Sequence, residues 1–255
     1  MVDSVIDFGD LNEAEKAISE LILQQPAPGK HAARSAISHI QRAWKLRELD
    51  PEMAVFRAIT GEEEAARAIF HALQRHRYSH ADQLNWRDHR HKGAVLPFIS
   101  AVGRLVMEIG FASPKVEIRE VNGSKQIVVE LVLRFPDGRV QRWIPNPPLN
   151  LVVLIDDKIH DFGSEIAKVA NEENFSSIKK CVADTANQRN LLLYASNSGV
   201  PKAVGSVDEI LRTKRTNIFT LLALFLLIDK YTQQQAFVSQ ALRGFLQMIE
   251  RLPTQ

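Results

Sequence analysis

Histidines and arginines gather in one short segment of the chain. Five of the eight histidines lie between His71 and His91, together with four arginines, and Lys92 follows directly. The acidic triplet at 62–64 precedes this segment. Histidine has the side-chain pKa closest to neutrality, and guanidinium groups match the geometry of phosphate. The residue types therefore predict a site that could transfer protons or hold a phosphate group.

Two glutamates of the triplet fall on an apolar helix face. Glu63 interrupts an apolar row that steps by three or four residues from Phe56 to Leu73, and Glu62 interrupts the neighbouring row. An ionised carboxylate on a buried face is costly unless a cation pairs with it. The expected partners lie at the start of the next helix: His91, Lys92 and Arg87. Such a contact could serve a reaction, or it could be a structural ion pair that fixes the register of two helices.

Helices are expected to position these side chains. Hydrophobic periodicity predicts helices over 11–22, 32–47, 51–77 and 94–109. Asp50-Pro51 marks the start of the third, with an N-cap acid followed by proline at the first helical position. Pro97 favours a start of the fourth near Ala94, because proline is best tolerated in the first turn. The apolar stripe can also be extended back to His91 and Lys92.

The sequence changes character after Pro114. Alternating patterns predict strands over 116–121, 127–135, 139–144 and 151–155, with turns at Asn122-Gly123 and 136–138. Helices resume near Ser164, and Ser206 with Glu209 predicts a capping box. The predicted fold class is α+β, mainly α. A helical bundle is expected over 1–112, and a small antiparallel sheet with C-terminal helices, packed on the first half, over 113–255.

The overall composition carries no strong charge bias. The chain has 255 residues and a net charge of +2 at pH 7, so an anion-binding site must rest on a local patch. Its single cysteine excludes an internal disulfide and a cysteine zinc cage, and it fits a reducing compartment. The most apolar run, 218–228, is shorter than the ~20 residues of a membrane-spanning helix, and the N-terminus lacks the features of a signal peptide. We expect a cytoplasmic protein that does not associate with membranes.

The histidine segment resembles a known ribonuclease motif. Arg75 and His80 have the spacing R-x4-6-H, with a polar residue after the arginine, that is found in the HEPN superfamily of helical ribonucleases and toxins. The resemblance, over about residues 36–110, extends to the paired glutamates in 59–70 and to His91-Lys92, which are similar to segments of abortive-infection proteins of that class. The family motif usually opens the last helix of the bundle, whereas Arg75 and His80 close a middle one. Arg87 and His91 form a second candidate pair, but the spacing between them is one residue shorter than the motif requires.

The resemblance implies an antiviral defence or toxin-like protein of the abortive-infection class, with metal-independent RNA cleavage as its candidate activity. It implies an arginine on the scissile phosphate and a histidine that transfers protons during attack by the RNA 2′-hydroxyl, without metal or other cofactor. The candidate catalytic residues are Arg75, His80, Arg87, His91, Glu62 and Glu63, and the candidate RNA- or phosphate-binding residues are Arg77, Arg90 and Lys92. The expected partners are RNA or a phage or host protein, and a second copy of the chain in a homodimer.

Two alternatives stay open at this point. His76 and His80 have the i, i+4 spacing that could place two metal ligands on one helix face. The segment could also be part of a non-catalytic module that binds protein or nucleic acid, with a structural network of glutamate, histidine and lysine. A convergence of Arg75, His80, Arg87 and His91 in one cleft would favour the ribonuclease.

Overall fold

The computed structural model describes residues 11–108, 112–121, 123–134, 137–151, 154–155, 157–171, 173–194 and 199–253. It confirms the predicted fold class, α+β and mainly α. The helices are α1 Glu13–Leu23, α2 Gly29–Leu46, α3 Pro51–Arg75, α4 His89–Glu108, α5 Gly163–Asn171, α6 Glu173–Leu193, α7 Val207–Asp229 and α8 Ala236–Arg251, with a short 3₁₀ turn, η1, at Ala81–Gln83. Within these ranges no helix combines the length and the apolar character needed to cross a membrane.

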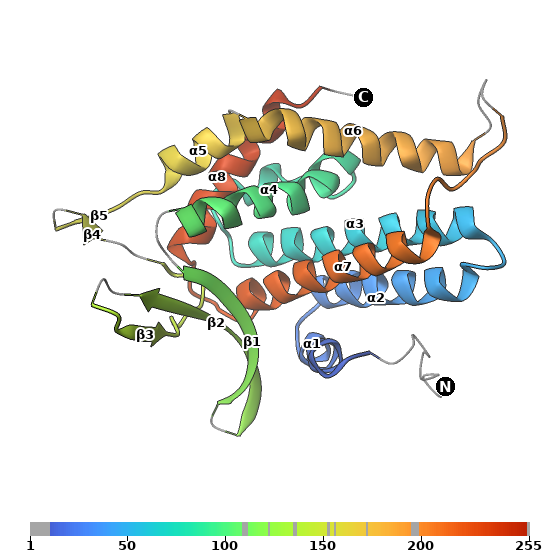
Figure 1. The fold of residues 1–255 in the computed structure, drawn as a ribbon. Helices are drawn as coiled ribbons and strands as arrows, with labels where there is room; N and C mark the ends of the chain where they lie inside the picture. The colour runs from blue at the N-terminus through green and yellow to red at the C-terminus, as the bar shows by residue number, and fades with distance from the viewer. Residues whose placement is uncertain are drawn as a thin grey trace.

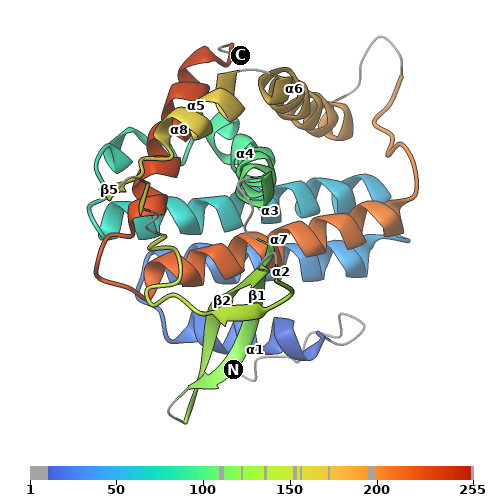
Figure 2. The same ribbon diagram turned by 60° about the vertical axis from the view of Figure 1, so that its left-hand side comes forward.

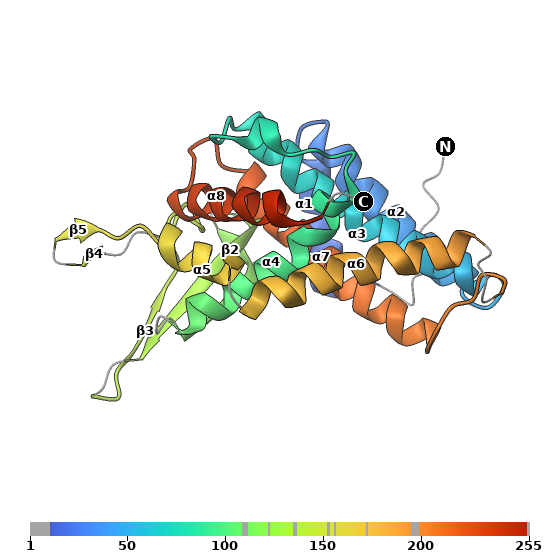
Figure 3. The ribbon, with the colours of Figure 1, turned by 90° about the horizontal axis from the view of Figure 1, so that it is seen from above.

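The helices pack in layers around α3. Figures 1 and 2 show α2, α3 and α7 side by side through the middle of the molecule, with α4, α5, α6 and α8 on one side. The sheet and α1 lie on the other side. Helix α6 runs alongside α4 and also reaches α3 (Figures 1 and 3). The main hydrophobic core draws side chains from both halves of the chain, so α7 and α8 complete the bundle formed by the earlier helices.

Helix α3 begins where the sequence predicts it. Asp50 Oδ1 accepts a hydrogen bond from the backbone N–H of Met53 at 2.9 Å, and Pro51 is the first helical residue. This arrangement satisfies one N–H left free by the helix start, and proline has no N–H to lose there. The helix ends at Arg75, two residues before the predicted Arg77, which has a positive φ of 54°. The tight end places the following residues in a loop.

Helix α4 begins at His89, five residues before the favoured start at Ala94. Asp88 caps it, because its Oδ1 accepts from the backbone N–H of Arg90 at 2.8 Å. Pro97 therefore lies inside the helix, where it cannot donate the usual bond to the carbonyl of Gly93. The earlier start has a direct consequence for the histidine segment. Residues 89 and 92 now share one helix face, whereas residue 91 points elsewhere.

The strands form two small antiparallel sheets. The larger has the order β1-β2-β3, with β1 Ala112–Val121, β2 Ser124–Arg134 and β3 Val140–Trp143. Val121 pairs with Ser124 across the predicted hairpin turn, where Gly123 has a φ of 75° and Asn122 lies outside the described residues. The predicted strand at 151–155 is observed at Leu154–Ile155 (β4). It pairs with Lys158–Ile159 (β5) in a hairpin that projects from the helices (Figure 3).

Glycine at position 61 allows α3 to approach its neighbours closely. A Cβ at Gly61 would lie 3.0 Å from Ile218 Cδ1 of α7 and 3.1 Å from the carbonyl oxygen of Ala36 in α2. A backbone oxygen cannot move aside as a flexible side chain can. Gly61 therefore sets the spacing of the three central helices.

We expect Gly61→Ala to lower the free energy of unfolding, although alanine favours a helix by ~1 kcal/mol over glycine. Overpacking of this kind costs about 1–3 kcal/mol. Gly103→Ala in α4 is the matched control, because nothing lies within 4 Å of its Cβ position, and it should gain stability. Urea denaturation measures both. An equal gain in both variants would show that the central helices are not in close contact at position 61.

Candidate functional site

A buried carboxylate on α3 forms the centre of the candidate site. Glu63 Oε2 lies 2.9 Å from Lys92 Nζ, and Glu63 Oε1 lies 2.8 Å from His89 Nδ1. The side chains of Glu63 and Lys92 are only 8% and 9% exposed. The expected contact between Glu63 and Lys92 is therefore confirmed. His89, from the same turn of α4, is a second donor to the buried carboxylate of Glu63 and helps to compensate its charge.

Helix α6 brings an arginine to the same histidine. Arg189 Nη1 lies 2.6 Å from His89 Nε2 and 2.9 Å from Nδ1. A guanidinium group has donors and no acceptor, so the imidazole must offer it a lone pair. With Nδ1 facing the carboxylate of Glu63, the contacts fit a neutral ring that donates from Nδ1 and presents Nε2 to Arg189. The ring is 43% exposed, so a solvent-borne molecule can reach it.

A small cleft of about 90 Å³ opens beside these groups, between α3, α4 and α6. Its lining comprises Glu63, His89, Arg90, Gly93, Val182, Thr185, Ala186, Arg189 and Asn190. At about 30 Å³ for each water, the volume corresponds to about three water molecules. The cleft thus has room for a small polar group, such as one phosphate, next to an imidazole and a guanidinium.

A stacked cluster of cations flanks this cleft. The guanidinium of Arg67 lies 4.3 Å from the ring centroid of Trp86, and that of Arg87 lies 4.5 Å from it. Arg67 is four residues after Glu63, one turn along the same helix. Trp86 is three residues before His89. The contact of Arg67 with Trp86 therefore holds the segment before α4 against α3, next in sequence to the cleft residues His89 and Arg90.

The structure does not bring Arg75 and His80 together. Arg75 Nε donates to Asp229 Oδ1 at 3.0 Å, and its Nη2 contacts His76 and the backbone carbonyl of Asp229. His80 has a φ of 69° and lies exposed in the loop after α3, where its Nδ1 is 3.4 Å from Gln83 Nε2. Burial raises the pKa of Asp229, although Arg75 and His76 act in the opposite direction. The R-x4-H spacing thus spans a helix end, and its arginine ties α3 to α7.

The shorter pair, Arg87 and His91, is also separated by its contacts. Arg87 is exposed and lies over Trp86, whereas His91 is buried, and its Nδ1 accepts from the backbone N–H of Asn85 at 3.3 Å. His91 Nε2 lies 3.9 Å from Asp88 Oδ2. Burial lowers the pKa of His91, while Asp88 opposes the shift and Arg90 adds to it.

The other candidate residues are distributed between the cleft and the surface. Glu62 pairs with Lys214 of α7 at 2.6 Å, not with α4, because adjacent residues of a helix point about 100° apart. Arg90 lines the cleft but pairs with Asp88 at 2.6 Å. Arg77 is exposed, with a backbone carbonyl that accepts from Gln234 at 2.7 Å. Of the proposed set, Glu63, Lys92 and Arg90 therefore meet at one place.

His76 and His80 do not share a helix face, since α3 ends at Arg75. His76 Nε2 instead lies 2.9 Å from the backbone oxygen of Asp229. Across the described part of the chain, no group of three or more histidine, cysteine, aspartate or glutamate side chains is arranged to hold a metal ion. The i, i+4 spacing that suggested a metal pair is thus interrupted by the loop.

Two polar residues that carry the chemistry of the cleft, His89 and Arg189, were absent from the predicted set. His89 could have been found from Asp88, whose capping role puts His89 and Lys92 three residues apart on one face. Arg189 carries a weaker signal: it is followed by Asn190, as in the R-x4-6-H pattern, but Tyr194 stands five positions on where a histidine would be. The structure supplies a histidine to Arg189 from α4 instead. Comparisons with protein-family models, curated proteins and solved structures gave no match.

The burial of the Glu63 contacts leads to a stability prediction. Glu63→Ala removes the partner of a Lys92 side chain that is 9% exposed, and it should cost about 3–5 kcal/mol of unfolding free energy. Replacing both members, as Glu63→Met with Lys92→Met, leaves no unpaired charge and should recover most of this loss. Chemical denaturation measures both variants. A cost below ~1 kcal/mol for Glu63→Ala would contradict the role of the carboxylate.

The lowered pKa of His91 predicts a pH dependence of stability. Below pH 6.5 the unfolded chain binds a proton at this residue more readily than the folded chain, so the stability present above pH 6.5 is lost as the pH falls. His91→Asn keeps an acceptor for the Asn85 N–H but cannot titrate. We expect it to lose less unfolding free energy than the wild type between about pH 7.5 and pH 5.5. Identical losses would show that His91 does not contribute.

Proposed function

We propose that this protein is a metal-independent endoribonuclease in which His89 transfers protons and Arg189 holds the scissile phosphate. The observation that carries the proposal is the arrangement of His89. Its Nδ1 faces the buried carboxylate of Glu63, while Nε2 faces Arg189 at the cleft. Proton transfer by a positioned imidazole contributes about 10²–10⁴-fold to a reaction rate. The resemblance of the glutamate pair and of His91-Lys92 to abortive-infection proteins agrees with this assignment.

The chemistry follows from the contacts of the cleft. Arg189 turns from His89 Nε2 to the bound phosphate, which frees the Nε2 lone pair. Nε2 then accepts the proton of an RNA 2′-hydroxyl, and the 2′-oxygen attacks the adjacent phosphorus. The bond to the 5′-oxygen breaks, and the protonated His89 returns its proton to that oxygen. Arg189 donates to the phosphate oxygens, on which negative charge develops. Glu63 orients His89 and stabilises the imidazolium, while the ion pair with Lys92 holds the carboxylate of Glu63 in place. The products end in a 2′,3′-cyclic phosphate and a 5′-hydroxyl.

The flanking stack supports a single-stranded substrate. Unpaired bases bind to aromatic rings and to the planes of arginine side chains. The Arg67–Trp86–Arg87 stack presents such planes beside the cleft, and Arg87 is exposed. A base next to the scissile phosphate would pack against the outer face of Arg87. A rigid duplex cannot expose its bases in this way, so single-stranded RNA is the proposed substrate.

The cellular role that we propose is antiviral defence or toxicity of the abortive-infection class, in the cytoplasm. The single cysteine fits a reducing compartment, and RNA is available there. We further propose a homodimer, because two cationic clefts related by a two-fold axis would concentrate positive potential that one chain with a net charge of +2 lacks. Light scattering at several protein concentrations measures the oligomeric state.

The competing function is a non-catalytic binding or regulatory module. One observation favours it: the pair of Glu63 and Lys92 is almost fully buried, as in a purely structural tie between two helices. In that case His89 and Arg189 would add to the tie without taking part in a reaction. The two functions differ in what happens when the exposed members of the cleft are removed.

Cleavage of a labelled single-stranded RNA tests the proposal. His89→Ala should lower the rate by about 10²–10⁴-fold and Arg189→Ala by about 10²–10³-fold, because each removes a group that acts in the transition state. Activity should survive EDTA, and the products should carry 2′,3′-cyclic phosphate ends. His80→Ala is the matched control, since His80 is also exposed but lies in the loop after α3, and it should retain full activity.

The opposite outcomes are equally clear. Wild-type protein that binds RNA without cleaving it, or a folded His89→Ala variant with unchanged activity, would leave the binding module as the better assignment. If His80→Ala loses activity and His89→Ala keeps it, the catalytic pair would be Arg75 and His80 at the end of α3. Loss of activity in EDTA would contradict the metal-independent reaction.

A further inference from the structure

Helix α2 presents a line of positive charge to solvent. Its side chains include no acid and six basic groups: Lys30, His31, Arg34, His39, Arg42 and Lys45. Positions 30, 34, 38, 42 and 45 step by three or four residues, so they share one helix face, about 22 Å long at 1.5 Å per residue. Within the described part of the chain, the two lysines and two arginines of this face have no ion pair. Their charges are therefore uncompensated.

At the edge of this face, two buried nitrogen atoms between α2 and α3 lack a partner. His39 Nδ1 and Arg57 Nε form no hydrogen bond with the described residues. His39 lies against Gly61 of α3, where an added Cβ would be 3.2 Å from the Cβ of His39, and Arg57 is one turn before Gly61 on the same side of α3. Buried polar groups are nearly always paired, and a neutral imidazole can donate from Nδ1. Both nitrogens can therefore donate to an incoming acceptor.

A second arginine lies beside the same point. The connection between α2 and α3 is short, so the helices run antiparallel, and Arg42, one turn after His39, is level with Arg57. Burial lowers the pKa of His39, Arg57 and Arg42 lower it further, and Glu64 acts in the opposite direction. Glu64 pairs with Arg67 at 3.4 Å. Among the described residues, the two guanidinium groups thus lie beside an imidazole without a carboxylate of their own.

The composition of the face indicates its partner. Protein interfaces are built around aromatic and other apolar anchors, and helices that lie on membranes bury Trp, Phe or Leu. The row on α2 has no such side chain, because Ser38 is its one uncharged member. Interfaces with nucleic acids are more polar and far more positive, and a guanidinium group matches the geometry of phosphate. A nucleic acid therefore fits this face better than a protein or a membrane.

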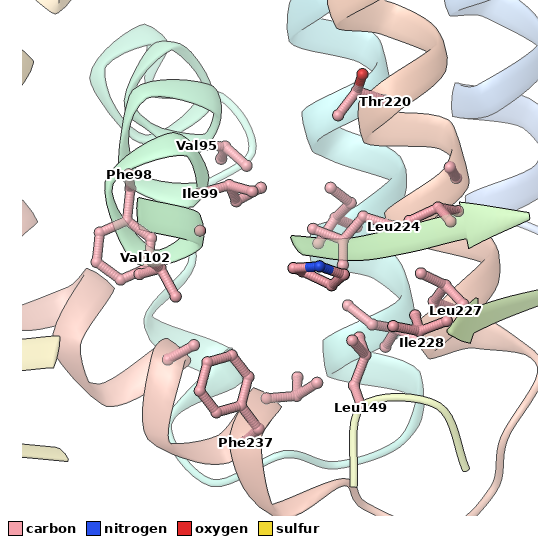
Figure 4. Close-up of a pocket in the computed structure, with 18 of the residues that line it drawn as sticks. Val95, Phe98, Ile99, Val102, Leu149, Thr220, Leu224, Leu227, Ile228 and Phe237 are labelled. Atoms are coloured by element: carbon pink, nitrogen blue, oxygen red, sulfur yellow. The ribbon is translucent and has the colours of Figure 1, made fainter. Parts of the chain in front are cut away.

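The face is also separate from the apolar cavity of the bundle. That cavity, of about 600 Å³, is lined largely by α4, α7 and α8. Figure 4 shows Ile99 and Val102 of α4 facing Leu224 of α7 across the open space. No described residue of α2 belongs to its wall. A partner that binds α2 therefore contacts polar and charged groups and no apolar pocket.

We propose that the exposed face of α2, together with Arg57 of α3, binds the phosphodiester backbone of a nucleic acid. One phosphate lies between Arg42 and Arg57 and accepts hydrogen bonds from both and from His39. Other phosphates of the strand meet Arg34 and Lys45. Such contacts position a strand and read no sequence. The proposal does not depend on the proposed ribonuclease activity, because the face shares no residue with the polar cleft.

Fluorescence anisotropy with labelled single-stranded 2′-O-methyl RNA tests the surface, because this RNA lacks the hydroxyl needed for cleavage. Arg42→Gln combined with Arg57→Gln should weaken binding about tenfold or more, since it removes charge-assisted hydrogen bonds. The slope of log affinity against log salt concentration should become shallower by about 0.7, for the contact with one phosphate of a single strand. No binding by the wild-type protein would overturn the proposal.

Arg243→Gln combined with Lys125→Gln is the matched control. These cations, on α8 and β2, pair with Asp161 and Glu20, and their removal changes the net charge by the same amount. The control should bind within about twofold of wild type, and equal losses in the two double variants would show that net charge alone sets the affinity. The loss at α2 should persist in an Arg189→Ala background, because distant sites act independently. A loss that disappears there would assign the phosphate contacts to the cleft.

DNA and lipid vesicles separate the sources of phosphate. The Arg42→Gln, Arg57→Gln variant should lose the same factor for 2′-O-methyl RNA and for single-stranded DNA, because both carry the phosphodiester, and a loss confined to one would contradict recognition of the backbone. Sedimentation with vesicles of phosphatidylserine and phosphatidylcholine tests a membrane. Vesicle binding that is lost in the variant, with nucleic-acid binding unchanged, would overturn the proposal.

The stability of Arg57→Met separates a binding residue from a structural one. The change removes a cation without a partner, so the urea midpoint should rise while the affinity for 2′-O-methyl RNA falls about fivefold. Arg75→Met is the control, because the guanidinium of Arg75 pairs with Asp229 at 2.9 Å, and its midpoint should fall. A lower midpoint for Arg57→Met with unchanged affinity would show that Arg57 is structural and would overturn the proposal.

Discussion

The compensation of one buried carboxylate governs how the helices of this protein meet. Glu63 lies on the packed face of α3 with 8% of its side chain exposed, and such a charge is stable only when a cation and hydrogen-bond donors compensate it. Lys92 and His89 meet this requirement from the first turn of α4. Arg189 of α6 then closes on the histidine. The need to compensate Glu63 therefore fixes where α4 starts relative to α3. It also brings α6 into contact with α4, although Arg189 is 100 residues after His89.

The same helix separates two environments of opposite character. Residues of the first turn of α4 face a polar cleft, while Ile99 and Val102, two turns further on, face an apolar cavity. An α-helix can do this because residues of one face recur every three or four positions and the opposite face is free to differ. Gly61 on α3 contributes by holding α2 and α7 close, so the central layer is a firm support for both sites.

The sequence predicted what depends on local signals. The fold class, the start of α3 at Asp50-Pro51, the Ser206 cap and the β1–β2 pairing follow from patterns a few residues long, and the structure contains them. The contact of Glu63 with Lys92 was also predictable, because a buried charge demands a partner. The start of α4 was not, since Pro97 suggested a later one. Arg189 could not be paired with His89 from sequence alone, because only tertiary packing joins α6 to α4.

The local balance of charges explains why the cleft is a better site for a single phosphate than the predicted pair, Arg75 and His80. At the end of α3, the guanidinium of Arg75 is paired with the carboxylate of Asp229 and also donates to a backbone carbonyl, so its donors are already used within the protein. In the cleft, the one carboxylate of Glu63 faces the two permanent cations Lys92 and Arg189, and His89 adds a third charge when protonated. An incoming phosphate restores neutrality there. This excess is local, so the proposed binding of one phosphodiester of a flexible strand does not require a large net charge, and the chain carries only +2.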